Sequence, residues 1–465
     1  MIDWRQVGFI ICALNLLPLV CFCATFVPAD NYLIDCGSTS TTSVGNRNFT
    51  SDTLSKKLLT TQQEILATTS ANSVSSKDDE SPLYRTARVF TGSSKHNLNA
   101  VKFDVSTQTI VLISGLTMQK NPFMKEYSIN VTTDTLEITF RPLDSSVAFV
   151  NAIEVVSVPD DLIPDDAFHL NPLTSYSGLR AQALETVWRV NMGGPVVTSR
   201  EDPFRRTWVL DLKFLLTSNL ANDVSNIPGV KYADGGATQN TAPLSVYGTA
   251  TEMNTNTSTS DTNLNFNVTW QFDVEPGFQY LVRAHFYDIV NKALNLLYFN
   301  VYIDSMAAAK DLDLSSKGNN VLGVPYFMDL IAPLADSNKL NVSIGASTSN
   351  KYNPNVILNG LEIMKMNNSI GSLSANAASG AGGDTSGSSS SHVGLIAGVS
   401  VGVVSVVVLA GVCCILCRKR RRLAQQRMSR TWIPLSVNDT HTMGSKYSND
   451  TNKQHQLSKA MEGKQ

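Results

Sequence analysis

Histidines and paired carboxylates are the residues of this sequence that offer acid–base chemistry. The histidines upstream of residue 393 are His96, His169, His285 and His392. A hydrolase would place a nucleophile in a Gly-x-Ser-x-Gly turn, and a metal site would space its ligands as His-x-x-x-His or Cys-x-x-Cys. Neither pattern occurs in this part of the sequence. We therefore interpret the histidines as structural and predict no catalytic residue, no metal site and no cofactor.

Two acidic pairs, Asp160-Asp161 and Asp165-Asp166, are further candidates, because glycosidases use two carboxyl groups. Both pairs stand beside prolines in a segment that reads as a connection. We predict that these carboxylates are solvated or cap turns, and that they do not act on a substrate.

Sequences of the form Asn-x-Ser/Thr indicate surface positions that a secreted protein can carry as glycosylated asparagines. Those upstream of residue 393 are Asn48, Asn130, Asn256, Asn267, Asn341 and Asn367. Asn438 and Asn449 also match, but the topology derived next places them in the cytoplasm, where we expect them to stay unmodified.

Residues 393–417 form an uninterrupted apolar segment without a charged residue. A helix of this length spans roughly 37 Å, at ~1.5 Å per residue, and exceeds the ~30 Å hydrocarbon core of a bilayer. The basic cluster Arg418-Lys-Arg-Arg-Arg422 follows and marks the cytoplasmic side. We predict a single-pass type I protein of the plasma membrane, with its N-terminus outside and residues 418–465 inside.

The same segment carries two further patterns. Gly394, Gly398 and Gly402 recur every four residues, and a glycine face of this kind lets two membrane helices approach closely. We predict dimerisation there, although glycine is also common in such helices. Near the inner boundary the cysteines are Cys413, Cys414 and Cys417. They suit palmitoylation, and inert thiols are the alternative.

The N-terminus predicts a secretory signal peptide over residues 1–23. Arg5 supplies a basic start, an apolar run follows, and Cys21 and Cys23 are small residues at the cleavage positions. Cys36 is then the only cysteine left in the outer region, so a hydrophobic core must hold the fold without an intramolecular disulfide. The net charge of −2 argues against a nucleic-acid partner.

Alternating apolar and polar runs between Gly, Pro, Asn and Asp predict an all-β outer region. The clearest runs cover residues 127–131, 136–140, 278–286, 297–303 and 340–344. Val, Ile, Phe, Tyr and Thr dominate them, as strands prefer. Many short strands of this kind are typical of β-sandwiches.

An internal repeat divides the outer region. Val147-Ala-Phe-Val-Asn-Ala-Ile-Glu-Val-Val156 matches Pro354-Asn-Val-Ile-Leu-Asn-Gly-Leu-Glu-Ile363, and Tyr32-Leu-Ile-Asp-Cys-Gly37 parallels Val187-Trp-Arg-Val-Asn-Met-Gly193. We predict two tandem β-sandwich domains over residues 24–172 and 177–369. A single large β domain with chance similarity is the alternative. Residues 370–392 are rich in Ser, Gly and Ala and predict a flexible stalk, and residues 418–465 predict a disordered tail.

Aromatic side chains could stack on a sugar ring, but strand positions favour core packing. The candidates are Phe90, Tyr127, Trp188, Trp208, Trp270, Tyr280 and Tyr326. We assign no ligand-binding residue from sequence, and we expect a ligand site in a cleft between the two sandwiches.

A family resemblance rests on motifs in order along the chain. They are Tyr32-Leu-Ile-Asp-Cys-Gly-Ser38, Tyr84-Arg-Thr-Ala-Arg-Val-Phe90, Asn191-Met-Gly-Gly-Pro195, Val282-Arg-Ala-His-Phe286 and Leu358-Asn-Gly-Leu-Glu362. Here the chain resembles the ectodomain of plant malectin-like receptor kinases, the FERONIA/THESEUS/HERKULES group, over roughly residues 25–435. The resemblance implies two malectin-like domains at the cell wall that sense secreted rapid-alkalinisation peptides, often with a small GPI-anchored co-receptor. Some members bind pectin.

Two departures from this family pattern affect the prediction. After Arg422 there is no Gly-rich phosphate loop, no His-Arg-Asp and no Asp-Phe-Gly, so we expect no kinase activity in this chain. Between His96 and Val101 the family has a longer insert with a further strand, so the first sandwich is predicted to be shortened.

The sequence therefore predicts a single-pass receptor-like protein without its own kinase. Its outer domains would bind a secreted peptide, a pectin-like polysaccharide or both, and it would pair with a full-length receptor kinase or a second copy of itself. A structural tether between wall and membrane, and a truncated product of a receptor kinase gene, are the alternatives.

Overall fold

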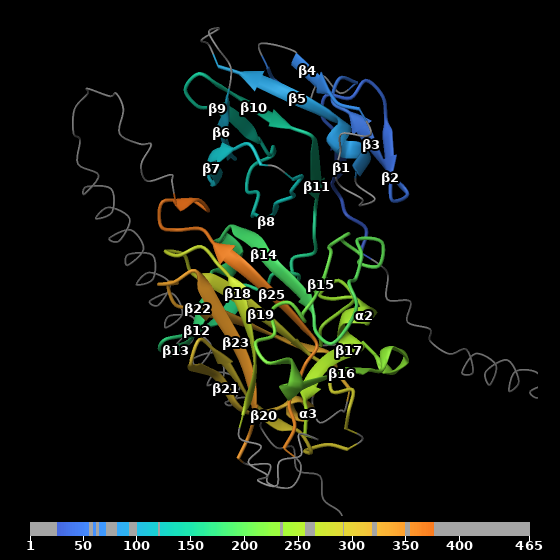
Figure 1. The fold of residues 1–465 in the computed structure, drawn as a ribbon, viewed down its shortest axis with the longest axis vertical. Helices are drawn as coiled ribbons and strands as arrows, with labels where there is room; N and C mark the ends of the chain where they lie inside the picture. Colours follow the sequence, from blue (N-terminus) through green and yellow to red (C-terminus); the bar gives the residue numbers. More distant parts are fainter. Residues whose placement is uncertain are drawn as a thin grey trace, which may run out of the picture. The chain divides into compact units, whose positions relative to one another are not determined.

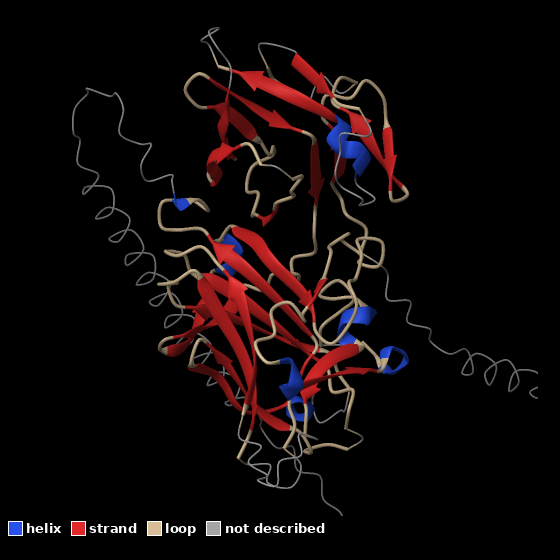
Figure 2. Cartoon of the chain, in the orientation of Figure 1, coloured by secondary structure: helices blue, strands red, loops and turns tan. Residues whose placement is uncertain are grey.

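A computed structural model of the protein describes eleven stretches of the chain. They are residues 26–54, 59–61, 65–70, 81–92, 100–119, 121–232, 236–255, 266–291, 293–318, 323–348 and 354–375. Strands dominate these stretches and the helices are short, as Figure 2 shows. The predicted all-β fold of the outer region is confirmed.

The strands fall into two sets that can be followed by their colours in Figure 1. The N-terminal set contains β1 (Asn31–Asp35), β2 (Thr42–Val44), β3 (Arg47–Ser51), β4 (Ile65–Thr68), β5 (Thr86–Thr91), β6 (Ala100–Ser106), β7 (Val111–Thr117), β9 (Thr139–Pro142), β10 (Ser146–Val150) and β11 (Ala152–Val156). One of its sheets has the order β11-β1-β3-β2, and the other has the order β4-β5-β10-β6-β7 with β9 also paired to β6.

The C-terminal set contains the remaining strands. They are β8 (Glu126–Ser128), β12 (Asp166–Leu170), β13 (Leu173–Ser177), β14 (Leu184–Asn191), β15 (Val209–Leu210), β16 (Ala221–Ser225), β17 (Thr249–Met253), β18 (Asn267–Asp273), β19 (Tyr280–Phe286), β20 (Tyr298–Ile303), β21 (Met306–Asp313), β22 (Tyr326–Ala332), β23 (Lys339–Ala346), β24 (Ile357–Leu358) and β25 (Gly360–Met366). The short helices in this part are α2 (Leu244–Tyr247) and α3 (Leu314–Lys317).

Three sheets make up the C-terminal set. The largest has the order β13-β12-β22-β19-β25-β14-β15, with β8 also paired to β14. The second has the order β18-β23-β20-β21, and the third has the order β16-β17-β24. Inward side chains of the first two sheets share one hydrophobic core, so these sheets form a β-sandwich.

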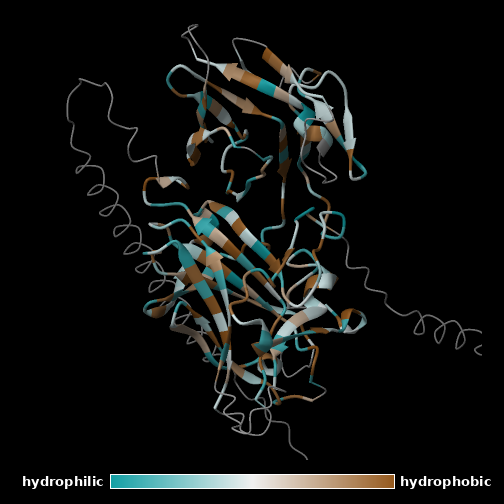
Figure 3. Ribbon diagram, viewed as in Figure 1, coloured by the Kyte–Doolittle hydropathy of each residue, from teal (hydrophilic) through white to brown (hydrophobic). Residues whose placement is uncertain are grey.

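Alternation along the strands builds this core. In β18, Val268, Trp270 and Phe272 are fully buried, and the residues between them are half-buried. The alternating hydropathy along the ribbons is visible in Figure 3. In β19 and β25 every residue is buried, because both strands lie inside the largest sheet and have side chains packed on both faces.

The repeat found in the sequence occupies matching places in the two sets. Gly37 follows β1 and Gly193 follows β14, and both have positive φ, at 79° and 60°. A Cβ at Gly37 would lie 2.2 Å from the Ala87 oxygen, and one at Gly193 would lie 2.0 Å from the Ala250 oxygen. In both sets, therefore, a glycine lets the turn after one strand press against the backbone of another, β5 or β17.

Strand pairing bears on one predicted boundary, which stays a prediction. The sequence placed residues 166–172 at the end of the first domain and residues 173–176 in neither domain. Instead, β12 pairs in parallel with β22, at Phe168↔Leu330 and His169↔Ile331, and so belongs to the C-terminal set. The alternation in β12 could not reveal this, because it specifies a buried face and not the partner strand.

Two predicted strands are also shorter than expected. The run at residues 127–131 forms only β8, which ends at Ser128, and the run at 136–140 becomes regular only at Thr139 in β9. By contrast, the run at 340–344 forms the eight-residue strand β23. The difference has a physical reason, because β23 is paired on both edges, by β18 and β20, whereas β9 pairs only with β6 among the described strands.

Replacing Gly193 by alanine should destabilise the C-terminal set strongly. The methyl group would collide with the Ala250 backbone and the residue would keep an unfavourable positive φ, so we expect a loss of about 2–4 kcal/mol. Gly277→Ala is the matched control, since its φ is 85° and a Cβ there would have no neighbour within 4 Å. Thermal melting of both variants checks the prediction, and equal losses would contradict it.

Candidate functional site

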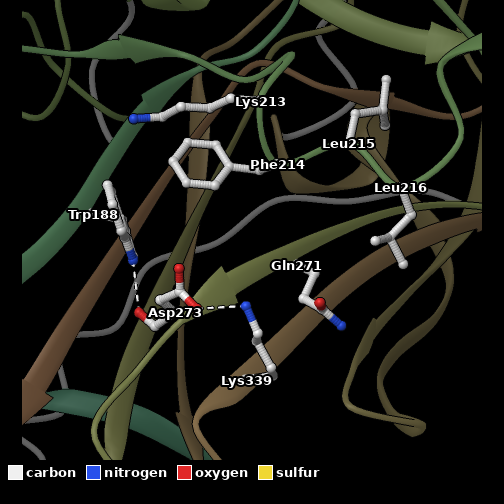
Figure 4. A pocket seen from close by; sticks show the side chains of 8 residues that line it. All are labelled: Trp188, Lys213, Phe214, Leu215, Leu216, Gln271, Asp273 and Lys339. Atoms are coloured by element: carbon white, nitrogen blue, oxygen red, sulfur yellow. Dashed lines mark hydrogen bonds and ion pairs between the residues drawn. The ribbon is translucent and has the colours of Figure 1, made fainter.

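A hollow of about 360 Å³ on the C-terminal set is the candidate ligand site (Figure 4). Its walls come from β14, β18, β23 and the segment after β15. The lining residues are Trp188, Lys213, Phe214, Leu215, Leu216, Gln271, Asp273 and Lys339. All of them belong to one set of strands, whereas the sequence predicted a cleft between two domains, and that cleft stays a prediction.

Backbone pairing fixes the segment that carries half of this lining. The Leu216 N–H donates to the Thr269 carbonyl at 2.9 Å, and the Gln271 N–H donates to the Phe214 carbonyl at 2.9 Å. Residues 214–216 therefore run along the edge of β18 that is not paired with β23. This pairing aims the Phe214 ring into the core and leaves Leu216 exposed at the rim.

The aromatic floor of the hollow is held from two sides. The Trp188 indole N–H donates to the Asp273 carbonyl at 2.8 Å, and its ring meets Phe214 edge-on with 4.9 Å between centroids. The Lys213 ammonium lies 4.9 Å from the Trp188 centroid and 4.7 Å from the Phe214 centroid. A cation therefore already covers the faces on which a neutral sugar would stack.

The two lysines of the hollow differ in their ion pairing. Lys339 forms an ion pair with Asp273, while no carboxylate partner of Lys213 is described. Lys213 is exposed, so its positive charge is available to an incoming anion. An exposed ammonium group above the two rings suits a ligand with a carboxylate. The lining contains no nucleophile–base pair, so the site can bind a ligand but has no evident means of cleaving one.

A second polar cluster lies inside the sandwich. The Arg189 guanidinium bonds Glu362 at 2.8 Å and holds Glu126 of β8 with contacts of 2.6 and 2.8 Å. On the other side of Glu362, His285 Nε2 lies 3.2 Å from the carboxylate, and His285 Nδ1 lies 3.0 Å from the Tyr247 hydroxyl. This Tyr–His–Glu order is that of a proton relay.

Burial decides against a catalytic role for this cluster. Tyr247 and His285 are fully inaccessible and Glu362 is 3% exposed, so no substrate can reach them. Burial lowers the pKa of His285, and the nearby Glu362 only partly opposes this. Burial alone would raise the pKa of Glu362, but Arg189 and the hydrogen bond from His285 hold it well below its ordinary value. The cluster is thus a neutral histidine beside a carboxylate ion, which is a structural arrangement.

The structure locates several residues that the sequence singled out. Trp208, Trp270 and Tyr280 are fully buried core residues, and only Trp188 of the seven aromatic candidates lines the hollow. Cys36 is buried, and burial together with Asp52 and Asp35 raises its thiol pKa. Within the described stretches, no group of three or more histidine, cysteine or acidic side chains could hold a metal ion.

The acidic pair Asp165-Asp166 holds a turn through hydrogen bonds, whereas Asp160 and Asp161 are exposed. Asp165 accepts hydrogen bonds from the Gly178 and Arg180 backbone N–H groups, both at 3.1 Å. Asp166 accepts a hydrogen bond from the Ser177 hydroxyl. These contacts tie together the start of β12 and the end of β13, which agrees with the predicted capping role.

The predicted glycosylation sites differ in accessibility. Asn48, Asn130 and Asn267 are exposed, as modification requires. Asn341 and Asn367 are half-buried and their side chains are engaged: Asn341 Oδ1 accepts from Gln271 at 3.1 Å, and Asn367 Oδ1 accepts from the Ala183 N–H at 2.7 Å. Asn256 lies outside the described residues. Modification at all six stays a prediction.

The predicted membrane segment also lies outside the described residues. This applies to the glycines Gly394, Gly398 and Gly402 and to the cysteines Cys413, Cys414 and Cys417. In the part of the chain that the structure describes, no helix is long and apolar enough to span a bilayer.

Comparison with known proteins assigns the fold. Residues 98–366 match the model of the malectin-like domain. The chain belongs to the malectin-like family. It is 47% identical to the receptor-like protein kinase HERK 1 of Arabidopsis thaliana over 457 residues, which cover 93% of this chain and 53% of the relative. It is 40% identical to THESEUS 1 of the same plant over 381 residues, covering 76% of this chain and 44% of the relative.

Solved structures of malectin-like ectodomains agree with this assignment. The FER chain in a complex with the plant peptide RALF23 and LLG2 has a TM-score of 0.63 and 27% identity, covering 75% of this chain and 98% of that chain. The ANXUR1 extracellular domain of Arabidopsis thaliana has a TM-score of 0.64 at 24% identity, covering 74% and 98%, and supports the fold. This malectin-like chain spans about half the length of the curated relatives it matches.

Sequence reasoning missed most of the hollow. Lys213, Phe214, Gln271 and Lys339 carry no recognisable motif, and they come from three separate segments. The pairing of residues 214–216 with β18, and of β23 with β18, brings them together, and no pattern in the sequence specifies these registers.

The buried histidine predicts a pH dependence of stability. His285 stays neutral in the folded protein because its pKa is lowered, but in the unfolded chain it binds a proton near pH 6.5. The unfolded state therefore binds more protons as the pH falls through this value, and stability is lost on acidification. The melting temperature should fall from about pH 7.5 to about pH 5.5, and His285→Gln should flatten this slope. An unchanged slope in the variant would contradict the prediction.

Proposed function

We propose that this chain is the ligand-binding outer region of a single-pass plasma-membrane receptor-like protein. The observation that carries the proposal is its likeness to the FER ectodomain, which has been solved in complex with the peptide RALF23 and with LLG2. That ectodomain and this chain share the fold over nearly the whole length of the FER chain. The proposed ligand is accordingly a secreted peptide of the rapid-alkalinisation type, bound together with a GPI-anchored co-receptor.

Signalling is proposed to pass through a kinase partner. The relatives are receptor-like kinases, but this chain matches only about half of their length, so their activity is not assigned to these residues. Pairing with a full-length receptor kinase, or with a second copy through the predicted membrane helix, would couple ligand binding to a response.

An acidic wall polysaccharide is a second candidate ligand, and the hollow favours it. Lys213 holds a positive charge over the Trp188 and Phe214 rings, and the rim adds the exposed side chain of Leu216. A uronate ring offers a carboxylate that matches the Lys213 ammonium, and its apolar face could meet the exposed Leu216 at the rim. The attraction between the uronate carboxylate and the Lys213 ammonium would distinguish pectin-like chains from neutral glycans.

Peptide binding should raise the melting temperature of the protein. A ligand that binds only the folded state at about 100 times its Kd stabilises that state by about 2.7 kcal/mol. We would titrate the chain, purified in detergent, with a rapid-alkalinisation peptide in the presence and absence of the co-receptor ectodomain. A rise that grows with peptide concentration is expected, and a scrambled peptide of the same composition should leave the melt unchanged. The absence of any rise with every peptide of this class would remove the peptide proposal.

Lys213→Glu should weaken binding of an oligogalacturonide by roughly tenfold or more, which corresponds to about 1.4 kcal/mol. The reason is that the substitution replaces the ammonium above the Trp188 ring with a carboxylate that repels the uronate. Lys310→Glu is the matched control, because it makes the same charge change at an exposed position of β21 outside the hollow. Calorimetric titration measures both variants, and equal weakening in the two would show that only the overall charge matters.

A further inference from the structure

One difference between the two sets is a pair of consecutive strands, β18 and β19, in the C-terminal set. In the C-terminal set, 44 residues separate the end of β17 at Met253 from the start of β20 at Tyr298, and they include β18 and β19. In the N-terminal set, eight residues separate the end of β5 at Thr91 from the start of β6 at Ala100. Eight residues cannot form two seven-residue strands and the turn between them.

Matched pairing shows which strands correspond. β4 and β5 pair antiparallel as β16 and β17 do, and β6 pairs with β7 and β9 as β20 pairs with β21 and β23. β1 pairs with β11 as β14 pairs with β25. The glycine contacts of Gly37 and Gly193 fix the same correspondence. Among the described strands of the N-terminal set, none corresponds to β18 or β19.

The first consequence is an open edge at β11. β25 pairs with β14 on one side and with β19 on the other, whereas β11 pairs only with β1 in the described stretches. Leu361 and Ile363 of β25 are fully buried. Their counterparts in the repeat, Ile153 and Val155, are only half-buried.

The second consequence is an open edge at β9. β23 pairs with β18 along its whole length, and its inward residues Val342 and Ile344 are fully buried. The matching residues of the N-terminal set, Ile138 and Phe140, are half-buried. Among the described strands, both sheets of this set therefore end, at the corresponding places, without a further partner strand and next to half-buried apolar side chains.

A charge marks the register of the β11 edge. In the C-terminal set, Arg283 of β19 stands opposite Glu362 of β25. The repeat places Glu154 at the position of Glu362, and Glu154 is exposed, with Arg47 at 2.5 Å as its partner. A strand added to β11 in the register of β19 would place a basic residue opposite Glu154. In the C-terminal set the Arg283 guanidinium itself binds Asp329 of β22, and Glu362 is bound by Arg189 and His285.

We propose that the N-terminal set accepts two strands donated by another polypeptide. One donor strand adds antiparallel to β11 and the other adds antiparallel to β9, as β19 and β18 do in the C-terminal set. The donor has alternating apolar side chains and carries a basic residue opposite Glu154. The partner is a polypeptide rather than a glycan, because rows of backbone N–H and C=O groups bind an extended chain through main-chain hydrogen bonds. The inference rests on strand pairing, side-chain burial and the position of Glu154, and it is independent of the proposed receptor function.

The first test uses a peptide that copies residues 267–286, which contain β18 and β19. The full chain, purified in detergent, is incubated with this peptide, and hydrogen exchange is followed by mass spectrometry. Slower exchange is expected in β11 and β9, while β25 stays unchanged because its edges are already paired. A scrambled peptide is the control. No protection at β11, or the same protection with the scrambled peptide, would overturn the proposal.

The second test reverses one charge on the protein and one charge on the peptide. Glu154→Lys should weaken binding of the peptide by roughly tenfold, and replacing the arginine of the peptide by glutamate should restore it. The rescue is needed because Glu154→Lys also breaks the ion pair with Arg47 and so disturbs the strand itself. Asp160→Lys is the matched control at an exposed position just beyond β11. Loss of binding in Asp160→Lys to the same degree, or no rescue by the exchanged peptide, would overturn the proposed register.

Discussion

The carboxylate of Glu362 lies at the centre of the largest sheet, and the arrangement around it depends on keeping that charge satisfied. Arg189 of β14 and His285 of β19 contact it from the two neighbouring strands. Removing one partner of such a buried pair typically costs about 3–5 kcal/mol, because the other charge is left without compensation. The same Arg189 also holds Glu126 of β8, so one guanidinium joins a strand from between β7 and β9 to the core of the C-terminal set. The residues resemble a catalytic relay, but they are buried. Their contacts instead stabilise the register of three strands.

The difference between the two sets of strands follows from the same pairing rules. β19 occupies the position between β22 and β25 and supplies His285 to Glu362. In the N-terminal set the corresponding carboxylate, Glu154, belongs to β11, and its ion-pair partner among the described residues is Arg47. β8 precedes β9 as β22 precedes β23, yet it pairs with β14 instead of a strand of its own set. In the described stretches, the N-terminal set has no strands that correspond to β18 and β19, and it shows shorter strands and half-buried apolar residues at the matching places.

The candidate ligand site has a different physical basis. It lies where an irregular segment follows the free edge of β18, so its side chains are held by backbone pairing and remain accessible. The ammonium of Lys213 is stabilised by two rings and keeps its charge free for a ligand.

Local patterns in the sequence determined the all-β class, the repeated halves and the buried faces of the strands. Alternation specifies which side of a strand is apolar, and the glycines at 37 and 193 specify turns that no other residue fits. The motif Asn-Gly-Leu-Glu362 likewise predicted a strand but did not indicate which strands pair with it. The tertiary structure alone decided the rest: that β12 joins β22, that His285 meets Glu362, and that Trp188, Lys213 and Lys339 share one hollow. The physical reason is that these contacts join residues far apart in the chain. They depend on strand register and partner choice, which a pattern with a period of two does not encode.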